Sequence, residues 1–384
     1  MTSPHRHFHR LAWVAALLAA CVIVFGGFVR LSHAGLSCPD WPTCYGRATW
    51  PTHEHEIAAA NEAFPQRAVE THKAWREQVH RHIAATLGLL VLGLALLGAR
   101  HRRLGTAQIL AAVGLVAVAI GLYMRGFYAL SAVLTVAGEL ILLRAAWAWD
   151  NRDLARVGVL LLAVIVFQAI LGLWTVSWLL KPVVVMGHLL GGLTLFGLLV
   201  WTAWKATPLN PLRTGAAGAL RSSVVAALIV LAVQIALGGW TSANYAALAC
   251  GTSFPSCAGQ WWPPVDFAEG FVLWRGIGVD YEGGILDGPA RAAIHLSHRW
   301  FALVVLVMLA TLVLRLARTP GLSGWAVALA VALVVQVGLG VSNVVFGLPL
   351  AVAAAHLGGA VLLLFLLVSL LARLEAPQAP EPHR

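Results

Sequence analysis

The sequence predicts an all-α polytopic membrane protein of two similar four-helix halves, with an extra helical pair in the first half. Composition is the first indication: 60% of the 384 residues are hydrophobic and only 11% are charged, against roughly a quarter charged in soluble domains. The second is a series of ten apolar runs, each near the roughly 20 residues that cross a bilayer as a helix. The third is a set of motifs that recurs in the second half.

The predicted spans follow one another closely, except where long polar loops intervene at about residues 32–78 and 244–291. The first span follows a basic HRHFHR stretch, but its length and the lack of a small-residue cleavage site favour a retained span over a signal peptide. The spans are expected at residues 11–31, 79–99, 104–124, 126–147, 157–179, 183–204, 222–243, 292–315, 324–345 and 349–373.

Lysine and arginine residues in the short loops predict the orientation. Clusters such as Arg100, Arg102 and Arg103 all fall on one side, so we take that side as cytoplasmic. Both termini are then cytoplasmic and both long loops face outward. The net charge of +10 reflects this topology, because the basic residues lie scattered beside apolar runs and form no tract for nucleic acid.

The two halves share motifs at fixed offsets. His80 recurs as His298 at an offset of 218, whereas His188 recurs as His356 at an offset of 168. The drop of 50 residues between the offsets indicates an insertion in the first half, which two of the predicted spans account for. Because four spans return the chain to its starting side, the duplication is expected to be parallel.

This pattern predicts four regions. The N-terminal half comprises residues 1–103 and 151–206, and the inserted helical pair occupies 104–150. The C-terminal half covers 207–376, and residues 377–384 form a disordered tail. Within the inserted pair, Glu139 is expected near the cytoplasmic end, reaching the interface or pairing with Arg144.

The four recurring histidines are candidate metal ligands. Each half offers two of them at similar depth on different helices, which is what axial ligation of a porphyrin iron requires. Zinc fits less well, since no thiolate or third histidine converges in either half. A single intramembrane histidine is more often a hydrogen-bonded packing residue, but recurrence favours ligands. The candidates are His80, His188, His298 and His356.

Charged residues near these histidines suggest further roles. Arg30, Arg81 and Arg299 could bind heme propionates near the outer surface, with snorkelling to lipid headgroups as the alternative. Glu77 shares a helix face with His80, and His295 stands at the corresponding place in the second half. This asymmetry suggests that Glu77 transfers a proton or stabilises charge; a solvent-facing interfacial glutamate is the alternative.

Two close cysteine pairs lie in the long loops, while Cys21 lies within the first span. Such pairs can close short disulfides in an oxidising compartment and brace the helix ends. A redox-active pair is the alternative. The pairs are Cys38 with Cys44, and Cys250 with Cys257.

Together these motifs resemble the heme A synthase family. The marks are GGFVRLSHAGLSCPDWPTCYG, EQVHR, QAILGLWTV and GHLLGG in the first half, and LGGW, the second cysteine pair, IHLSHR and QVGLGVSNVVFGLPLAVAAAH in the second. They touch nearly the whole chain except about 104–150. The insertion is a departure, because family members usually have eight spans, and it puts in doubt any partner contact that uses that edge.

The resemblance implies oxidation of the C8 methyl group of heme O to a formyl group, which gives heme A for cytochrome oxidase. It implies a heme b cofactor in the second half and heme O as the substrate in the first half. Carried over by position, the heme b ligands are His298 and His356, and the heme O ligands are His80 and His188.

The resemblance also implicates Glu77 in the chemistry and matches Cys38 with Cys44 to the family's outer-loop pair. It implies a bacterial inner (plasma) membrane location with periplasmic long loops. Heme O synthase and an unidentified electron donor are expected partners, besides membrane lipid, and a homo-oligomer stays open. The competing interpretations are a diheme b-type electron-transfer protein that handles quinone, and a secondary transporter.

Overall fold

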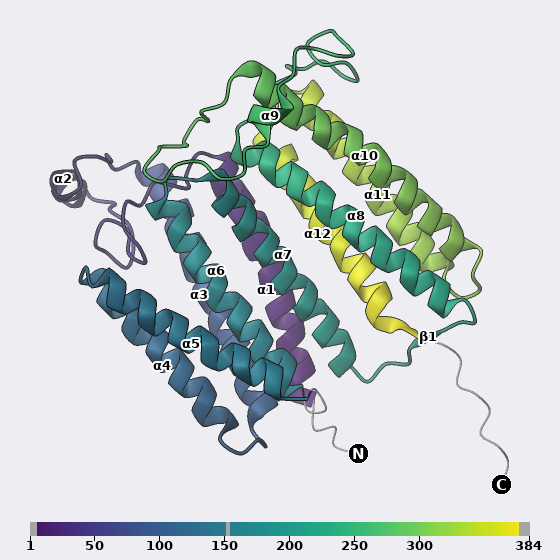
Figure 1. Cartoon of the computed structure of the whole chain (residues 1–384), viewed down its shortest axis with the longest axis horizontal. Helices are drawn as coiled ribbons and strands as arrows, with labels where there is room; N and C mark the ends of the chain where they lie inside the picture. The colour runs from purple at the N-terminus through teal and green to yellow at the C-terminus, as the bar shows by residue number, and fades with distance from the viewer. Residues whose placement is uncertain (1–5, 151–153, 376–384) are drawn as a thin grey trace. The chain divides into compact units, whose positions relative to one another are not determined.

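The computed structural model describes residues 6–150 and 154–375, so the tail predicted at 377–384 lies outside the described residues. Within the described residues ten helices are long and apolar enough to cross a membrane, which confirms the predicted all-α polytopic class (Figure 1). They are α1 (Arg6–Leu31), α3 (Thr71–Ala99), α4 (Gly105–Met124), α5 (Tyr128–Ala148), α6 (Ala155–Ser177), α7 (Pro182–Ala206), α8 (Ala217–Ala243), α10 (Gly288–Ala317), α11 (Ser323–Val345) and α12 (Leu350–Arg373).

Four short elements were not predicted. Helices α2 (Glu54–Ala63) and α9 (Phe267–Gly270) lie in the two long loops that the sequence predicts to face outward, called the first and second outer loops below. Strands β1 (Leu212–Arg213) and β2 (Leu374–Glu375) pair in parallel, with Leu212 opposite Leu374. Hydropathy could not reveal these elements, because none of them crosses the membrane.

Helix α3 begins at Thr71 and α10 at Gly288, ahead of the expected starts at 79 and 292. The early turns of α3 are polar, so hydropathy marks only its apolar remainder. Glu77 therefore lies well inside a helix, and not at its entrance.

The chain forms two compact units. One runs to Leu180 and includes Gly191–Ala206; the other comprises Lys181–Leu190 and the chain from Thr207 onward. Helix α7 is thus divided, with its outer part grouped with the second unit.

In the second unit, α8 packs on α10 and α12, and α11 packs on the same two helices. Helices α10 and α12 therefore stand at opposite corners of a four-helix arrangement.

In the first unit, α3 packs between α1 and α6, as α10 does between α8 and α11. The approach of α3 to α6 is close because both helices carry glycine where they meet: a Cβ on Gly98 would lie 3.0 Å from the Leu154 carbonyl oxygen, and one on Gly158 would lie 3.1 Å from Ala95 Cα. Small residues at such contacts are typical of helix packing in membranes.

The inserted helices α4 and α5 pack on each other, and α5 also packs on α6. Glu139 lies near the middle of α5, so the expected position near the cytoplasmic end was wrong. Its Oε2 has no hydrogen-bond partner among the described residues, and that part of the chain contains no ion pair between Glu139 and Arg144. The exposed position of Arg144 explains this result.

Candidate functional site

His298 lies in the third turn of α10 and leans against α8. Its Cε1 is 2.9 Å from the position that a Cβ on Gly238 would occupy, so only glycine leaves room for the ring. Gln234, one turn earlier on α8, places its amide Nε2 3.2 Å from His298 Nδ1. The imidazole is thus held between a bare stretch of α8 backbone and one amide.

His356 lies in the second turn of α12 and leans against α11 in the same way. Its Cε1 is 3.1 Å from the position of a Cβ on Gly340. Its Nδ1 has no hydrogen-bond partner in the described part of the chain. His298 and His356 thus stand on α10 and α12, the two helices at opposite corners of the bundle.

His80 on α3 shows the same relation to α1. Its Nε2 is 2.7 Å from the position of a Cβ on Gly26, and its ring lies 6.3 Å from that of Phe25. A histidine ring packed directly against a glycine of the neighbouring helix therefore occurs in both units. His188 lies in the part of α7 that is grouped with the second unit, and its pairing with His80 stays a prediction.

Two glutamines also recur. Gln168 packs its amide directly on Gly191, three residues after His188, and Gln336 packs on Gly359, three residues after His356. Gln168 Nε2 and Gln336 Oε1 have no hydrogen-bond partners among the described residues. Each is a buried polar atom one turn below a candidate ligand, where an unpaired group is costly unless something bonds to it.

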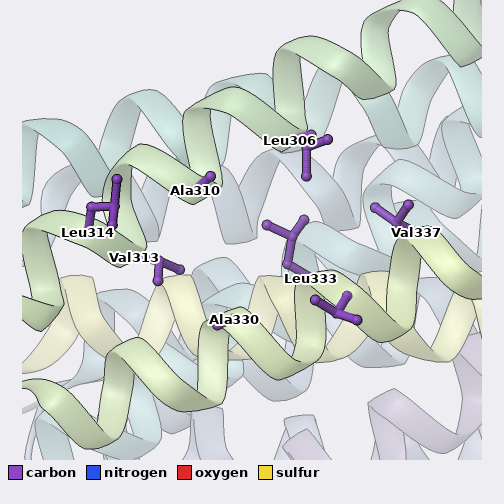
Figure 2. Close-up of a pocket in the computed structure, with 8 residues that line it drawn as sticks. Leu306, Ala310, Val313, Leu314, Ala330, Leu333 and Val337 are labelled. Atoms are coloured by element: carbon purple, nitrogen blue, oxygen red, sulfur yellow. The ribbon is translucent and has the colours of Figure 1, made fainter.

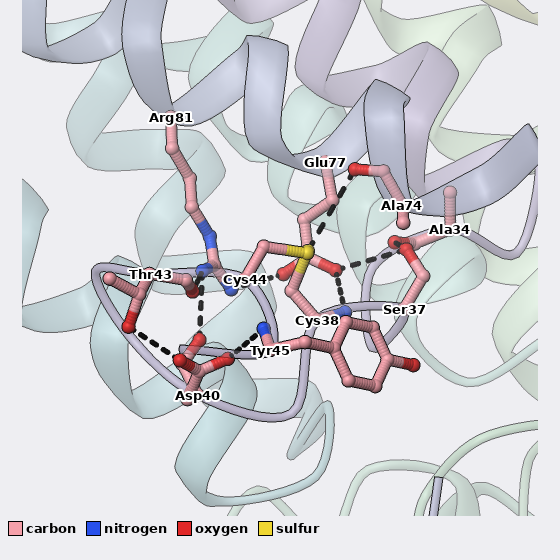
Figure 3. A network of polar contacts seen from close by, with 10 residues as sticks. All are labelled: Ala34, Ser37, Cys38, Asp40, Thr43, Cys44, Tyr45, Ala74, Glu77 and Arg81. Atoms are coloured by element: carbon pink, nitrogen blue, oxygen red, sulfur yellow. Dashed lines mark hydrogen bonds and ion pairs between the residues drawn. A yellow bond between two sulfur atoms is a disulfide. The ribbon is translucent and has the colours of Figure 1, made fainter. Parts of the chain in front are cut away.

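Glu77 is almost fully buried, with 5% of its surface exposed. Its Oε2 accepts hydrogen bonds from the Cys38 backbone N–H at 2.9 Å and from Ser37 Oγ at 3.2 Å. Its Oε1 pairs with Arg81 Nη2 at 2.6 Å. Figure 3 shows this carboxylate directed at the outer loop that follows α1.

Arg81 extends the same network. Its Nη1 donates to the backbone carbonyls of Asp40, at 2.8 Å, and Thr43. The Asp40 carboxylate in turn accepts hydrogen bonds from Thr43 Oγ1, Tyr45 N and Gly46 N. The loop is therefore held from within by Asp40 and from α3 by Arg81. The propionate contact predicted for Arg81 stays a prediction, but its guanidinium already donates hydrogen bonds to the loop backbone.

In the second unit, an arginine also binds the carbonyls of a disulfide loop, but its partner on the helix is a histidine. Arg299 donates to the carbonyls of Ser253 and Ser256 at 3.2 and 3.0 Å, and its Nε donates to His295 Nε2 at 2.7 Å. His295 Nδ1 lies 2.9 Å from the Ala246 carbonyl. Since Nε2 accepts, the ring proton resides on Nδ1, and His295 is neutral in this network.

Both predicted disulfides are present, and their cysteines are at most 1% exposed. After the second cysteine of each pair, two residues with positive φ make the same turn. These residues are Tyr45 and Gly46 in the first loop, and Ala258 and Gly259 in the second. An antiparallel bridge then joins Cys44 to Arg47 and Cys257 to Gln260. Because the cysteines of both disulfides are buried, a structural role is favoured over a redox-active one.

Tyr45 anchors the first outer loop. Its hydroxyl donates to the carbonyls of Arg67 and Ala68 at 3.2 and 3.1 Å, and its ring packs edge-on against Phe64. Burial raises the pKa of Tyr45 to about 12. The loop thus has a small core of its own.

Sequence reasoning missed two polar residues of the second unit. Lys181 is 1% exposed and places Nζ 3.4 Å from the ring centroid of Trp274; burial lowers its pKa. Gln234 contacts His298, as described above. Neither residue belongs to a recurring motif, so no repeat comparison could have identified it. Arg30 lies in the last turn of α1, and its predicted propionate contact stays a prediction.

An apolar groove of about 440 Å³ runs between α10 and α11 (Figure 2). Its lining includes none of the candidate ligands, and its side chains carry no polar groups. They are Leu306, Ala310, Val313, Leu314, Ala330, Leu333, Val334 and Val337. Elsewhere in the described residues, no cluster of three or more His, Cys, Asp or Glu side chains could hold a metal ion.

Comparison with known families gives a match to the family described as cytochrome oxidase assembly protein, over residues 9–132 and 129–368. The heme A synthase of Shewanella oneidensis is 36% identical over 365 residues, which cover 94% of this chain and 96% of that protein. The chain belongs to the heme A synthase family. The heme A synthases of Rhizorhabdus wittichii and Caulobacter vibrioides are each 27% identical, over 91% and 95% of this chain and 89% and 94% of their own lengths.

The matched ranges of the heme A synthase family include all four candidate histidines and both outer loops. Family membership, with ten apolar helices, makes this a multi-pass membrane protein. It disfavours the electron-transfer and transporter interpretations, and it agrees with the resemblance in the sequence motifs.

Proposed function

We propose that this protein converts heme O into heme A by oxidising the C8 methyl group to a formyl group. The conversion removes four electrons in total, so a hydroxymethyl heme is the expected two-electron intermediate. The observation that carries the proposal is the diagonal pair His298 and His356, each seated on a glycine of a neighbouring helix. Family membership gives this pair its chemical context.

The residues of the second unit fit a b-type heme. Two imidazoles stand on the helices at opposite corners of the bundle. Gln336 Oε1 is a buried acceptor without a hydrogen-bond partner in the described part of the chain, and it would lie near the bound heme. His298 and His356 would hold the iron, and the bound heme would supply one-electron redox chemistry.

In the first half, His80 and His188 would hold heme O. The seat of His80 on Gly26 mirrors that of His298 on Gly238, which supports equivalent roles for these rings. The amide of Gln168, 7% exposed, packs on Gly191 as that of Gln336 packs on Gly359. Arg30 and Arg81 would bind the propionates of heme O, and Arg299 those of heme b, because guanidinium groups pair well with carboxylates.

Glu77 would act beside the substrate as the group that receives or stabilises a proton. Its carboxylate lies one turn before His80 on α3 and is desolvated by burial. To receive a proton it must loosen one of its contacts with Ser37, Cys38 or Arg81. The outer loop and the chemistry are thereby linked through one side chain.

The membrane setting follows the same proposal. The bacterial inner membrane would hold the protein with both termini cytoplasmic and both disulfide loops periplasmic, an oxidising location that suits the cystines. Heme O synthase would supply the substrate. The oxidation would also need an oxidant to take up the four electrons and a source of the formyl oxygen; with dioxygen in both roles, an electron donor of unidentified nature would supply the electrons that reduce the second oxygen atom to water. Membrane lipid surrounds the apolar helices.

The test is chromatographic analysis of hemes from cells with and without the protein. Appearance of heme A only with the protein is expected; its absence would refute the proposal. Purified protein should show a low-spin b-type spectrum that His298→Ala and His356→Ala remove and His72→Ala, at an exposed position in the first turn of α3, leaves intact. Retention of the spectrum when both ligands are alanine would refute their assignment.

A further inference from the structure

Arg76 lies in the second turn of α3, four residues before His80. Residues at this spacing share one face of a helix and are separated by about 6 Å along its axis. Arg76 stands on the side of His80 toward Thr71, the end of α3 that the sequence predicts to face outward. A cationic side chain is therefore positioned one turn from a candidate axial ligand of heme O.

The guanidinium of Arg76 is held by aromatic rings and not by a carboxylate. Its Cζ lies 5.2 Å from the ring centroid of Phe28 and 5.8 Å from that of Trp75. Its Nε is shielded from solvent and has no hydrogen-bond partner among the described residues, and no ion pair between those residues includes Arg76. Aromatic faces hold a guanidinium through its flat side, so the N–H donors in its plane can bind an anion.

The same aromatic cluster reaches the imidazole of His80. The ring centroid of Phe25 lies 6.3 Å from that of His80. It also lies 5.8 Å from the centroid of Phe28 and 6.4 Å from that of Trp75. One aromatic cluster of α1 and α3 thus joins Arg76 to His80. This combination suits a macrocycle that has apolar faces and carboxylates on one edge.

Arg81, which also neighbours His80 in the sequence, has donors that are already bonded to protein. Its Nη1 donates to the carbonyls of Asp40 and Thr43, and its Nη2 pairs with Glu77. A propionate on Arg81 would therefore compete with the outer loop. Arg76 would instead gain an acceptor for a buried donor without losing a hydrogen bond.

We propose that Arg76 binds a propionate carboxylate of heme O when His80 holds the iron, while Phe28 and Trp75 fix the guanidinium plane. The inference rests on the proposed function and adds a substrate-binding residue to it. Axial ligation alone leaves the macrocycle able to turn about the iron–nitrogen bond. The C8 methyl group shares a pyrrole ring with one propionate, so a held propionate would also fix the position of the methyl group that reacts.

The second unit has no equivalent of Arg76. At the offset that relates His80 to His298, Arg76 corresponds to Ile294, whose side chain is fully buried. An isoleucine side chain has no donor for a carboxylate. The contact is therefore confined to the half that would receive heme O, as expected for a residue that positions a substrate.

The experiment measures binding of heme O and of its propionate dimethyl ester to the full-length protein, without oxygen or reductant so that the substrate persists. Bound hemes are isolated by gel filtration and quantified by chromatography, which also gives the heme b content. Wild type is compared with Arg76→Met, Arg76→Gln and Arg125→Met, a matched change at the exposed residue that follows α4.

Arg76→Met should weaken the binding of heme O about 10- to 100-fold, the usual cost of losing a hydrogen bond to a charged group. Arg76→Gln, which loses the charge and keeps an amide donor, should weaken it less but measurably. Arg125→Met should bind heme O like wild type. Because Arg76 lies in the other unit, heme b content should be the same in all four proteins.

The dimethyl ester has no carboxylate, so wild type and both Arg76 variants should bind it with equal affinity. Equal weakening of heme O and ester would overturn the inference, because Arg76 would then support the fold or bind a lipid phosphate. Unchanged binding of heme O would overturn it as well. If Arg76→Met does not accumulate, the same comparison with Arg76→Gln decides. A failure of the proposed function is separately visible: cells with wild type would form no heme A, although the difference between heme O and its ester persists.

Discussion

Glu77 and Arg81 form an ion pair one helical turn apart on α3, with Oε1 and Nη2 separated by 2.6 Å, and both side chains bind the outer loop. The second unit keeps the arginine and replaces the carboxylate with a neutral imidazole, His295. Both pairs hold a disulfide loop over the helix ends. The two units thus share this contact between helix and loop and differ in its charge, because a carboxylate stands in one and an imidazole in the other.

Substitutions of Glu77 can distinguish its contribution to holding the loop from its proposed role in the oxidation of heme O. Glu77→Ala leaves the buried Arg81 charge uncompensated, so we expect it to lower stability by about 3 kcal/mol, the lower end for breaking a buried pair. Glu77→Gln keeps an acceptor for the Cys38 N–H and should cost less. Both should retain heme b while heme O or a partly oxidised heme accumulates, as measured by chromatography. Normal heme A formation by Glu77→Gln would limit Glu77 to bracing.

Gly238→Ala should displace His298. A Cβ at this position would lie 2.9 Å from the ring Cε1, which is too close for an ordinary contact. We expect most heme b to be lost, as measured by the heme-to-protein ratio after purification. Gly218→Ala on the same helix is the control, since nothing lies within 4 Å of its Cβ position, and it should raise stability by roughly 0.5–1 kcal/mol. Equal heme contents would contradict the proposed seat of His298.

The membrane spans and the disulfides could be predicted from the sequence because each has a local cause. Length and hydropathy determine a span whatever its neighbours are, and two cysteines close together in one loop have few alternative partners. The offsets between the two halves also indicated which histidines are equivalent. None of this information depends on how helices pack.

What escaped prediction depends on packing between distant segments. Glu77 and Arg81 were assigned to chemistry and propionates, because spacing cannot reveal that both reach back to carbonyls and amides near Cys38. Gln234 was overlooked because its significance lies in its distance from His298, 64 residues away. The first turns of α3 were not predicted because they are polar, and hydropathy identifies only the apolar part of a helix.

The disulfides should be inaccessible in the folded protein. Cys38, Cys44 and Cys250 are 0% exposed and Cys257 is 1% exposed. We therefore expect mild reductant followed by a maleimide to leave these cysteines unlabelled, and labelling to appear only after denaturation. Cys21→Ser serves as the background, because Cys21 is the exposed free thiol of the described residues. Rapid labelling of a native loop would instead support redox-active cysteines.

The first outer loop should lose stability in acid because of Glu56. Its Oε2 accepts hydrogen bonds from the backbone N–H groups of Thr52 and His53, and its Oε1 pairs with Arg47 at 2.6 Å. These hydrogen bonds, with a smaller contribution from Arg47, lower the pKa of Glu56 from 4.5 to about 2. A carboxylate with a lower pKa in the folded state stabilises that state fully above about pH 4.5 and loses the contribution as the pH falls toward 2.

Hydrogen exchange of the loop amides, measured between pH 6 and pH 2.5 and corrected for intrinsic rates, should therefore show protection that falls below about pH 4.5. Glu56→Gln should show weaker protection at pH 6 and a flatter pH dependence. Glu62→Gln, a matched change on an exposed part of the same helix, should behave like wild type. Identical profiles for Glu56→Gln and wild type would mean that Glu56 does not hold the start of α2, and that acid acts on the loop through other groups.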